Sequence, residues 1–125
     1  MKVLFKQAMP FIFGFGLVLA TVLLLMPSYA VPKALDFYDK AQHSLVFVTL
    51  TLAGLMTYQE RLKTVCWGLC VYGGLIEVLQ STLTMTRHGD VLDWFADSVG
   101  IVVGLVLYLL GHQIIKKNAI NKIAI

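Results

Sequence analysis

Charged residues are scarce in this chain, at 14% of its 125 positions. Soluble globular domains carry about 25% charged residues. A chain this short also has too much surface to hide a hydrophobic content of 58% in its own core. The mean hydropathy of +0.80 points the same way. The composition argues against a soluble enzyme, a nucleic-acid-binding module and a disordered tail, and favours a chain whose solvent is a lipid bilayer.

Cysteine is also rare, and the two that are present, Cys66 and Cys70, lie four positions apart in an apolar run. They form no disulfide framework and are too few for a zinc site, so we expect packed thiols. Internal repeats, linkers and low-complexity segments are absent as well. The sequence therefore predicts a single membrane domain over residues 1–125.

Four apolar stretches occupy most of the chain. A helix needs about 20 residues to cross the roughly 30 Å of hydrocarbon in a bilayer, and each stretch is long enough. The sequence therefore predicts an all-α fold, a polytopic membrane protein built as a bundle of four transmembrane helices. The expected helices are residues 8–27, 41–58, 64–82 and 91–113.

The first apolar stretch has a second interpretation. Lys2 and Lys6, an apolar run and then Ser28-Tyr29-Ala30 resemble a signal peptide with a small-x-small cleavage site. The run is longer than the roughly 7–15 residues of a typical signal peptide core. We expect it to be retained as the first transmembrane helix; cleavage, which would leave three spans, is the alternative.

Lysine and arginine positions predict the orientation, because cytoplasmic loops carry an excess of them. With both termini in the cytoplasm, seven basic residues lie inside and three lie outside. The inner set is Lys2, Lys6, Arg61, Lys63, Lys116, Lys117 and Lys122, and the outer set is Lys33, Lys40 and Arg87. We therefore expect an N-in/C-in topology.

Polar residues from three predicted helices gather at the expected outer side. Asp39 and His43 are four positions apart, and Asp90, Asp93 and Asp97 follow an i, i+3, i+7 spacing, which places each set on one helix face. An ionisable residue within the bilayer is expected to face the bundle interior or a wet cavity and to have partners. The predicted ligand-binding or functional cluster is Asp39, Lys40, His43, Glu77, Gln80, Arg87, Asp90, Asp93 and Asp97.

The expected outer side carries six carboxylates against three lysine or arginine side chains, a balance of −3. Such a cluster needs a protonated carboxylate, a bound cation or the positive ends of helix dipoles. Asp36 and Asp90 suit the dipole role as N-caps. Glu77, near a helix C-terminus, and Asp97, about two turns into a helix, do not, so we expect both to need specific partners. The available partners are Lys40, His43 and Arg87.

The order of these residues resembles the VanZ-like family of small bacterial membrane proteins. The matching fragments are Asp39-Lys40-x-x-His43, Glu77-x-x-Gln80 and Arg87-x-x-Asp90-x-x-Asp93-x-x-x-Asp97-x-x-Gly100. The resemblance covers about residues 36–110. The family commonly has Asn at the position of Asp97, so this chain has one more charge, or a proton, to accommodate.

The resemblance implies a membrane location and a role in the cell envelope. The family is named for a protein that accompanies glycopeptide resistance clusters and raises tolerance to teicoplanin, a lipoglycopeptide. An effect on teicoplanin tolerance is therefore one implication. Many relatives have no link to resistance genes, so the resemblance predicts location better than it predicts resistance.

Our main hypothesis is a multi-pass protein of the bacterial cytoplasmic (inner) membrane that binds a lipid-linked or amphiphilic ligand at its outer face. The expected partners are membrane lipid, this ligand and a second copy in an oligomer, with no nucleic acid, no cofactor and no resident metal. Three alternatives stay open. They are a metal- or acid–base-dependent enzyme acting on a lipid-linked substrate, a proton-coupled transporter, and a purely structural helix bundle. No catalytic residue can be assigned from the sequence.

Overall fold

The computed structural model describes residues 2–30, 39–86 and 89–124. Within these ranges every regular element is helical, which confirms the all-α prediction and the number of long helices. The elements are α1 (Lys2–Leu25), the short 3-10 helix η1 (Ser28–Ala30), α2 (Asp39–Thr57), α3 (Leu62–Leu83) and α4 (Val91–Ile123).

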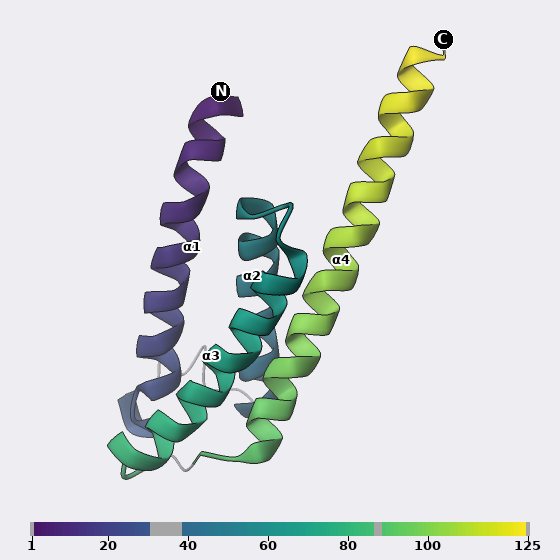
Figure 1. Cartoon of the computed structure of the whole chain (residues 1–125). Coiled ribbons are helices and arrows are strands. Elements are labelled where there is room, and N and C mark those ends of the chain that lie inside the picture. Colours follow the sequence, from purple (N-terminus) through teal and green to yellow (C-terminus); the bar gives the residue numbers. More distant parts are fainter. Residues whose placement is uncertain (1, 31–38, 87–88, 125) are drawn as a thin grey trace.

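The four long helices alternate in direction (Figure 1). The end of α1, the start of α2, the end of α3 and the start of α4 lie together at one end of the bundle. The start of α1 and the end of α4 lie at the opposite end. The polar residues singled out above are in the segments that meet at the first end, so the alternation brings distant parts of the sequence together.

Three of the described helices, α1, α3 and α4, are long and apolar enough to cross a membrane. Helix α2 is not among them, because its first turns carry Asp39, Lys40, Gln42 and His43. The expectation of four spans and of an N-in/C-in topology therefore stays a prediction.

Helices α1 and α4 are longer than the ranges expected from hydropathy. Helix α1 begins at Lys2 rather than near residue 8, and α4 continues ten residues past 113, to Ile123. The 33 residues of α4 correspond to about 50 Å, well beyond a hydrocarbon layer of roughly 30 Å. No proline or glycine follows Gly111 to end the helix.

Helices α2 and α4 form the most extensive packing pair of the bundle. Glycines on α4 allow this approach, since a Cβ at Gly100 would overlap the backbone oxygen of Ser44 and one at Gly104 would lie 2.7 Å from the Cβ of Thr51. Small residues at this four-residue spacing let two helix backbones approach closely. Phe47 of α2 is fully buried at this crossing.

The outside of the bundle is strongly apolar. Large hydrophobic side chains are exposed on every long helix, including Phe11, Leu45, Trp67 and Val102. Half of the largest fully buried side chains described, by contrast, are polar, among them His43 and Asp97. This inside-out distribution is what a helix bundle surrounded by lipid needs, because lipid tails solvate apolar side chains and polar groups must be satisfied within the protein.

Candidate functional site

Four ionisable side chains form the centre of the polar end of the bundle, and we call them the buried cluster: His43 of α2, Glu77 of α3, and Asp93 and Asp97 of α4. Each is at most 8% exposed. Three helices therefore contribute to one ionisable site. Its members lie on inward-facing stripes of their helices, as the spacing in the sequence predicts.

His43 and Asp97 make the central contact of the buried cluster. Nδ1 of His43 lies 2.9 Å from Oδ1 of Asp97, and both side chains are completely buried. With Asp97 ionised, the imidazole donates from Nδ1, because an ionised carboxylate only accepts hydrogen bonds. Oε1 of Glu77 is 3.6 Å from the same nitrogen. A Cβ at Gly73 would come within 2.8 Å of Oδ2 of Asp97, so this glycine leaves the room that the carboxylate fills.

Glu77 has its second partner in the loop before α4. Its Oε2 accepts a hydrogen bond of 2.9 Å from the backbone N–H of Asp90. A position near the end of α3 is unfavourable for an acid in its own helix, but the carboxylate reaches the N-terminal end of α4, where the dipole favours negative charge. The expected need of Glu77 and Asp97 for specific partners is met by His43 and by a backbone group.

Asp90 and Lys40 lie on the partly exposed side of the polar end, next to the buried cluster. Asp90 is the N-cap of α4, and its Oδ1 accepts the backbone N–H of Leu92 at 2.9 Å. That hydrogen bond, together with Lys40, holds the pKa of Asp90 below its usual range. Nζ of Lys40 lies 3.4 Å from Oδ2 of Asp90 and 3.1 Å from Oδ1 of Asp93. Lys40 is thus paired with two acids of the α4 start.

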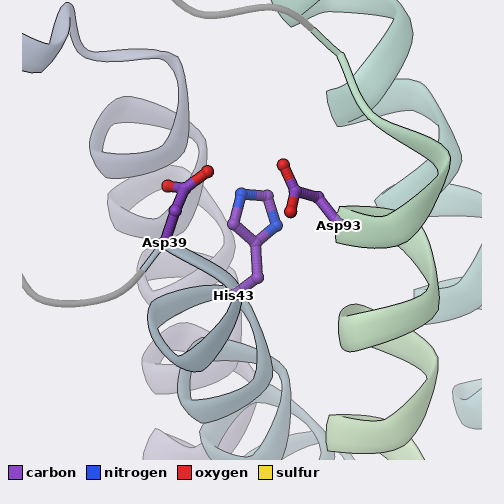
Figure 2. Close-up of side chains that lie close together, drawn as sticks. All are labelled: Asp39, His43 and Asp93. Carbon is purple, nitrogen blue, oxygen red and sulfur yellow. The ribbon is translucent and has the colours of Figure 1, made fainter.

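Asp39 lies one turn before His43 at the exposed start of α2. Figure 2 shows the imidazole of His43 between the carboxylates of Asp39 and Asp93. One ligand atom from each of these three residues lies within 4.8 Å of the others. The same is true of His43, Glu77 and Asp97, so His43 belongs to two groups of side chains that could hold a metal ion.

Gln80 of the predicted cluster is described but does not join this site. Gln80 is buried, and its Nε2 donates a 2.7 Å hydrogen bond to the backbone oxygen of Leu24, near the end of α1. Gln80 therefore fixes α1 against α3 rather than facing the acids. Arg87, which was expected to pair with a carboxylate, lies outside the described residues, as does Asp36.

A cavity of about 330 Å³ opens beside the buried cluster, between α3 and the start of α4. Its walls include Gly74, Glu77, Ser81, Asp90 and Trp94. The indole N–H of Trp94 donates a 2.9 Å hydrogen bond to the backbone oxygen of Cys70, which holds the ring in place. Nothing in the sequence position of Trp94 indicated a cavity wall.

The described polar end is strongly acidic. Five carboxylates, those of Asp39, Glu77, Asp90, Asp93 and Asp97, face a single lysine, Lys40, within the parts of the chain that the structure describes. The site therefore suits a cationic group better than an anionic one.

Comparison with known proteins identifies the family. No curated protein and no solved structure matches this chain significantly. A family model described as VanZ/LLP1 matches residues 3–112, which include α2, α3 and nearly all of α1. The match contains the whole of the region about 36–110 in which the sequence resembles VanZ-like proteins. That resemblance is confirmed: the chain is a membrane protein that belongs to the VanZ/LLP1 family.

Proposed function

We propose that this protein binds the cationic head group of an amphiphilic or lipid-linked ligand in the cavity between α3 and α4. In this proposal the chain is a multi-pass protein of the bacterial cytoplasmic membrane, with both termini inside. The polar end of the bundle then faces outward, at the level of the lipid head groups of the outer leaflet.

The observation that carries the proposal is the composition of the cavity wall. Glu77 and Asp90 supply carboxylates, and Trp94 supplies an aromatic ring fixed by its hydrogen bond to the backbone of Cys70. Acidic groups next to an aromatic face are the usual surroundings of a bound ammonium group.

An anionic head group fits the described site less well. Lys40 is the described lysine at this end, and it already lies within 3.4 Å of both Asp90 and Asp93. Binding a phosphate there would require these ion pairs to break and would bring two negative charges close to five carboxylates.

The tail of the ligand would lie along the apolar surface next to the cavity. Val78 and Val91 belong to the cavity wall and are 60% and 77% exposed. A head group at Glu77 would therefore leave an attached acyl chain in contact with lipid-facing side chains. This arrangement needs no closed apolar pocket, because the surrounding bilayer solvates the tail.

The test compares three amphiphiles with the same twelve-carbon tail: dodecylamine, dodecyl phosphate and dodecyl maltoside. The protein is held in nanodiscs, and a Trp67→Phe background leaves Trp94 as the single tryptophan reporter. We expect saturable quenching or enhancement of Trp94 fluorescence with dodecylamine, at concentrations about tenfold lower than with the other two.

The matched variants are Glu77→Gln and Glu60→Gln. Glu60 is an exposed acid in the turn between α2 and α3, at the other end of the bundle. Dodecylamine binding should be lost in Glu77→Gln and kept in Glu60→Gln, with both variants folded. Equal binding of the three amphiphiles, or equal binding by the two variants, would show that the cavity does not select a cationic head group.

A cellular arm of the same test concerns teicoplanin, which as a lipoglycopeptide belongs to the amphiphile class. Expression of the wild type should raise the teicoplanin concentration that stops growth of a susceptible Gram-positive strain. The Glu77→Gln variant should lose this effect at equal membrane abundance. A wild type without effect would separate amphiphile binding from antibiotic tolerance.

An acid–base enzyme is the second candidate function. It is favoured by the 2.9 Å contact between His43 and Asp97, since a carboxylate that orients a histidine is a common arrangement for a general base. The complete burial of His43 weighs against it, because a substrate would need a path to the ring. Turnover of a lipid-linked substrate that is abolished in Asp97→Leu but not in Glu60→Gln would favour the enzyme.

A further inference from the structure

We propose that Asp39, His43 and Asp93 form a binding site for one divalent transition-metal ion, of the Mn²⁺ or Zn²⁺ type, between the starts of α2 and α4. The site is distinct from the α3–α4 cavity, and the inference does not depend on the function proposed above.

The first support is geometric. One ligand atom from each of the three side chains lies within 4.8 Å of the other two. Ligands at bonds of about 2.0–2.1 Å around a tetrahedral ion lie about 3.3 Å apart, so small side-chain rotations bring the three atoms into place. Figure 2 shows the imidazole of His43 between the two carboxylates, which come from α2 and from α4.

The second support is Nε2 of His43, the ring nitrogen that makes no hydrogen bond to the described residues. Nε2 is buried and has no hydrogen-bond partner among the residues that the structure describes. The side chain as a whole is 0% exposed, so water does not satisfy this nitrogen in the way that it would at a surface. In Figure 2 the ring nitrogen farther from the backbone faces the opening between Asp39 and Asp93.

The third support is the other ring nitrogen. Nδ1 lies 2.9 Å from Oδ1 of Asp97, which is completely buried. Histidine ligands of metal ions commonly donate their second N–H to a carboxylate, which fixes the tautomer and raises the basicity of the coordinating nitrogen. When Nδ1 donates to Asp97, Nε2 is the ring nitrogen left to coordinate an ion, on the side of the ring away from Asp97.

Electrostatics supports a cation at this point. The described polar end holds five carboxylates and one lysine, and that lysine contacts Asp93 through one oxygen at 3.1 Å. One carboxylate oxygen each of Asp39 and Asp93 lies within 4.8 Å of a ring nitrogen of His43. A divalent ion would offset two of these negative charges.

The ligand set indicates the class of metal. One imidazole nitrogen with two carboxylate oxygens suits Mn²⁺ or Zn²⁺ better than Ca²⁺ or Mg²⁺, which prefer oxygen ligands only. Asp39 is exposed, so the ion has an entry path and water can complete its coordination. The alternative group, His43 with Glu77 and Asp97, would have to use the nitrogen that already contacts Asp97.

The test is a titration of the full-length protein in nanodiscs with Mn²⁺ after treatment with a chelator. Loss of the free Mn²⁺ signal in electron paramagnetic resonance counts the bound ions, and nitrogen modulation of the bound signal reports the histidine. We expect one Mn²⁺ per chain, displaced by Zn²⁺ but not by equal Mg²⁺, with nitrogen modulation that is absent in His43→Gln.

The decisive variant is Asp39→Asn, because Asp39 is exposed at a helix start and asparagine is tolerated there. It should weaken Mn²⁺ binding by about tenfold or more, whereas the control Glu60→Gln should change it by less than about twofold. Wild type that binds no Mn²⁺ and no Zn²⁺, or equal affinities for these two variants, would overturn the proposal. Asp93→Asn tests the second carboxylate ligand in the same way. If Asp93→Asn fails to fold, the result for Asp39→Asn decides between the outcomes.

Discussion

His43 of α2 contacts Asp97 of α4 inside the bundle, where each side chain depends on the other as its polar partner. Its Nδ1 and Oδ1 of Asp97 are both buried, at a separation of 2.9 Å, so neither can turn to water if the other is lost. Hydrogen bonds that involve a charged group contribute about 1.5–3 kcal/mol, and an abandoned buried partner adds a desolvation cost. This pair is therefore the residue-scale contact on which the α2–α4 interface most depends.

We predict that Asp97→Leu lowers the free energy of unfolding by about 2–3 kcal/mol, because it leaves the N–H of His43 without an acceptor. Asp97→Asn should cost less than half as much, since its side-chain oxygen still accepts. Unfolding in mixed micelles with increasing denaturing detergent, followed by circular dichroism, measures both. Equal losses in the two variants would mean that charge, not the hydrogen bond, matters at this position.

For individual residues, the sequence predicts which acids need a specific partner better than it predicts which group that partner is. Glu77 and Asp97 are recognisable as acids that helix dipoles do not explain, and both have specific contacts. His43 was among the expected partners. The backbone N–H of Asp90 was not, because every residue except proline has such a group and it leaves no mark in the sequence.

Among the elements, α2 and α4 depend on glycine for their close approach. A Cβ at Gly100 would meet the backbone oxygen of Ser44, which cannot rotate out of the way as a side chain could. At Gly111, further along the same helix, nothing lies within 4 Å of the added atom. The two positions thus form a matched pair on one helix.

We expect Gly100→Ala to destabilise the protein by about 1–3 kcal/mol through forced separation of α2 and α4. Gly111→Ala should be neutral or stabilising by up to about 1 kcal/mol, because alanine favours a helix. Thermal unfolding in one detergent compares them directly. If the two variants shift the midpoint in the same direction, the close contact at Gly100 is not a determinant of stability.

Helix ends were harder to predict from the sequence than helix number. Hydropathy reports how much of a segment is apolar, and the polar turns at the start of α1 and the end of α4 fall outside that signal although they remain helical. The start of α4 was predictable at 91, because Asp90 is an N-cap with an acid in the following turn.

At the scale of the whole molecule, the alternating helices place the start of α1 and the end of α4 at the same end of the bundle (Figure 1). The excess of lysine and arginine at that end predicts that it faces the cytoplasm. Met85 lies at the polar end and is 97% exposed, and Gln59 lies in the exposed turn at the other end.

We predict that a cysteine at Met85 reacts with a membrane-impermeant maleimide in intact cells, whereas a cysteine at Gln59 reacts only after the cells are opened. Both are introduced with Cys66 and Cys70 replaced by serine, so that each chain has one thiol. The expected labelling ratio in intact cells is about tenfold in favour of Met85→Cys. The reverse pattern would establish the opposite orientation, and labelling of both sites would exclude a fully inserted bundle.

The contact between His43 and Asp97 has a consequence for how the chain is made. Of the described helices α4 is synthesised last, so α2 and α3 are made before the carboxylate of Asp97 that meets His43. Until α4 arrives, the nascent chain carries ionisable groups that the bilayer disfavours by roughly 2–3 kcal/mol each. The arrival of the last helix then completes the interior in one step. We therefore expect chains arrested before α4 to be degraded faster by membrane proteases than the full chain, because His43 and Glu77 then lack their partners on the α4 segment.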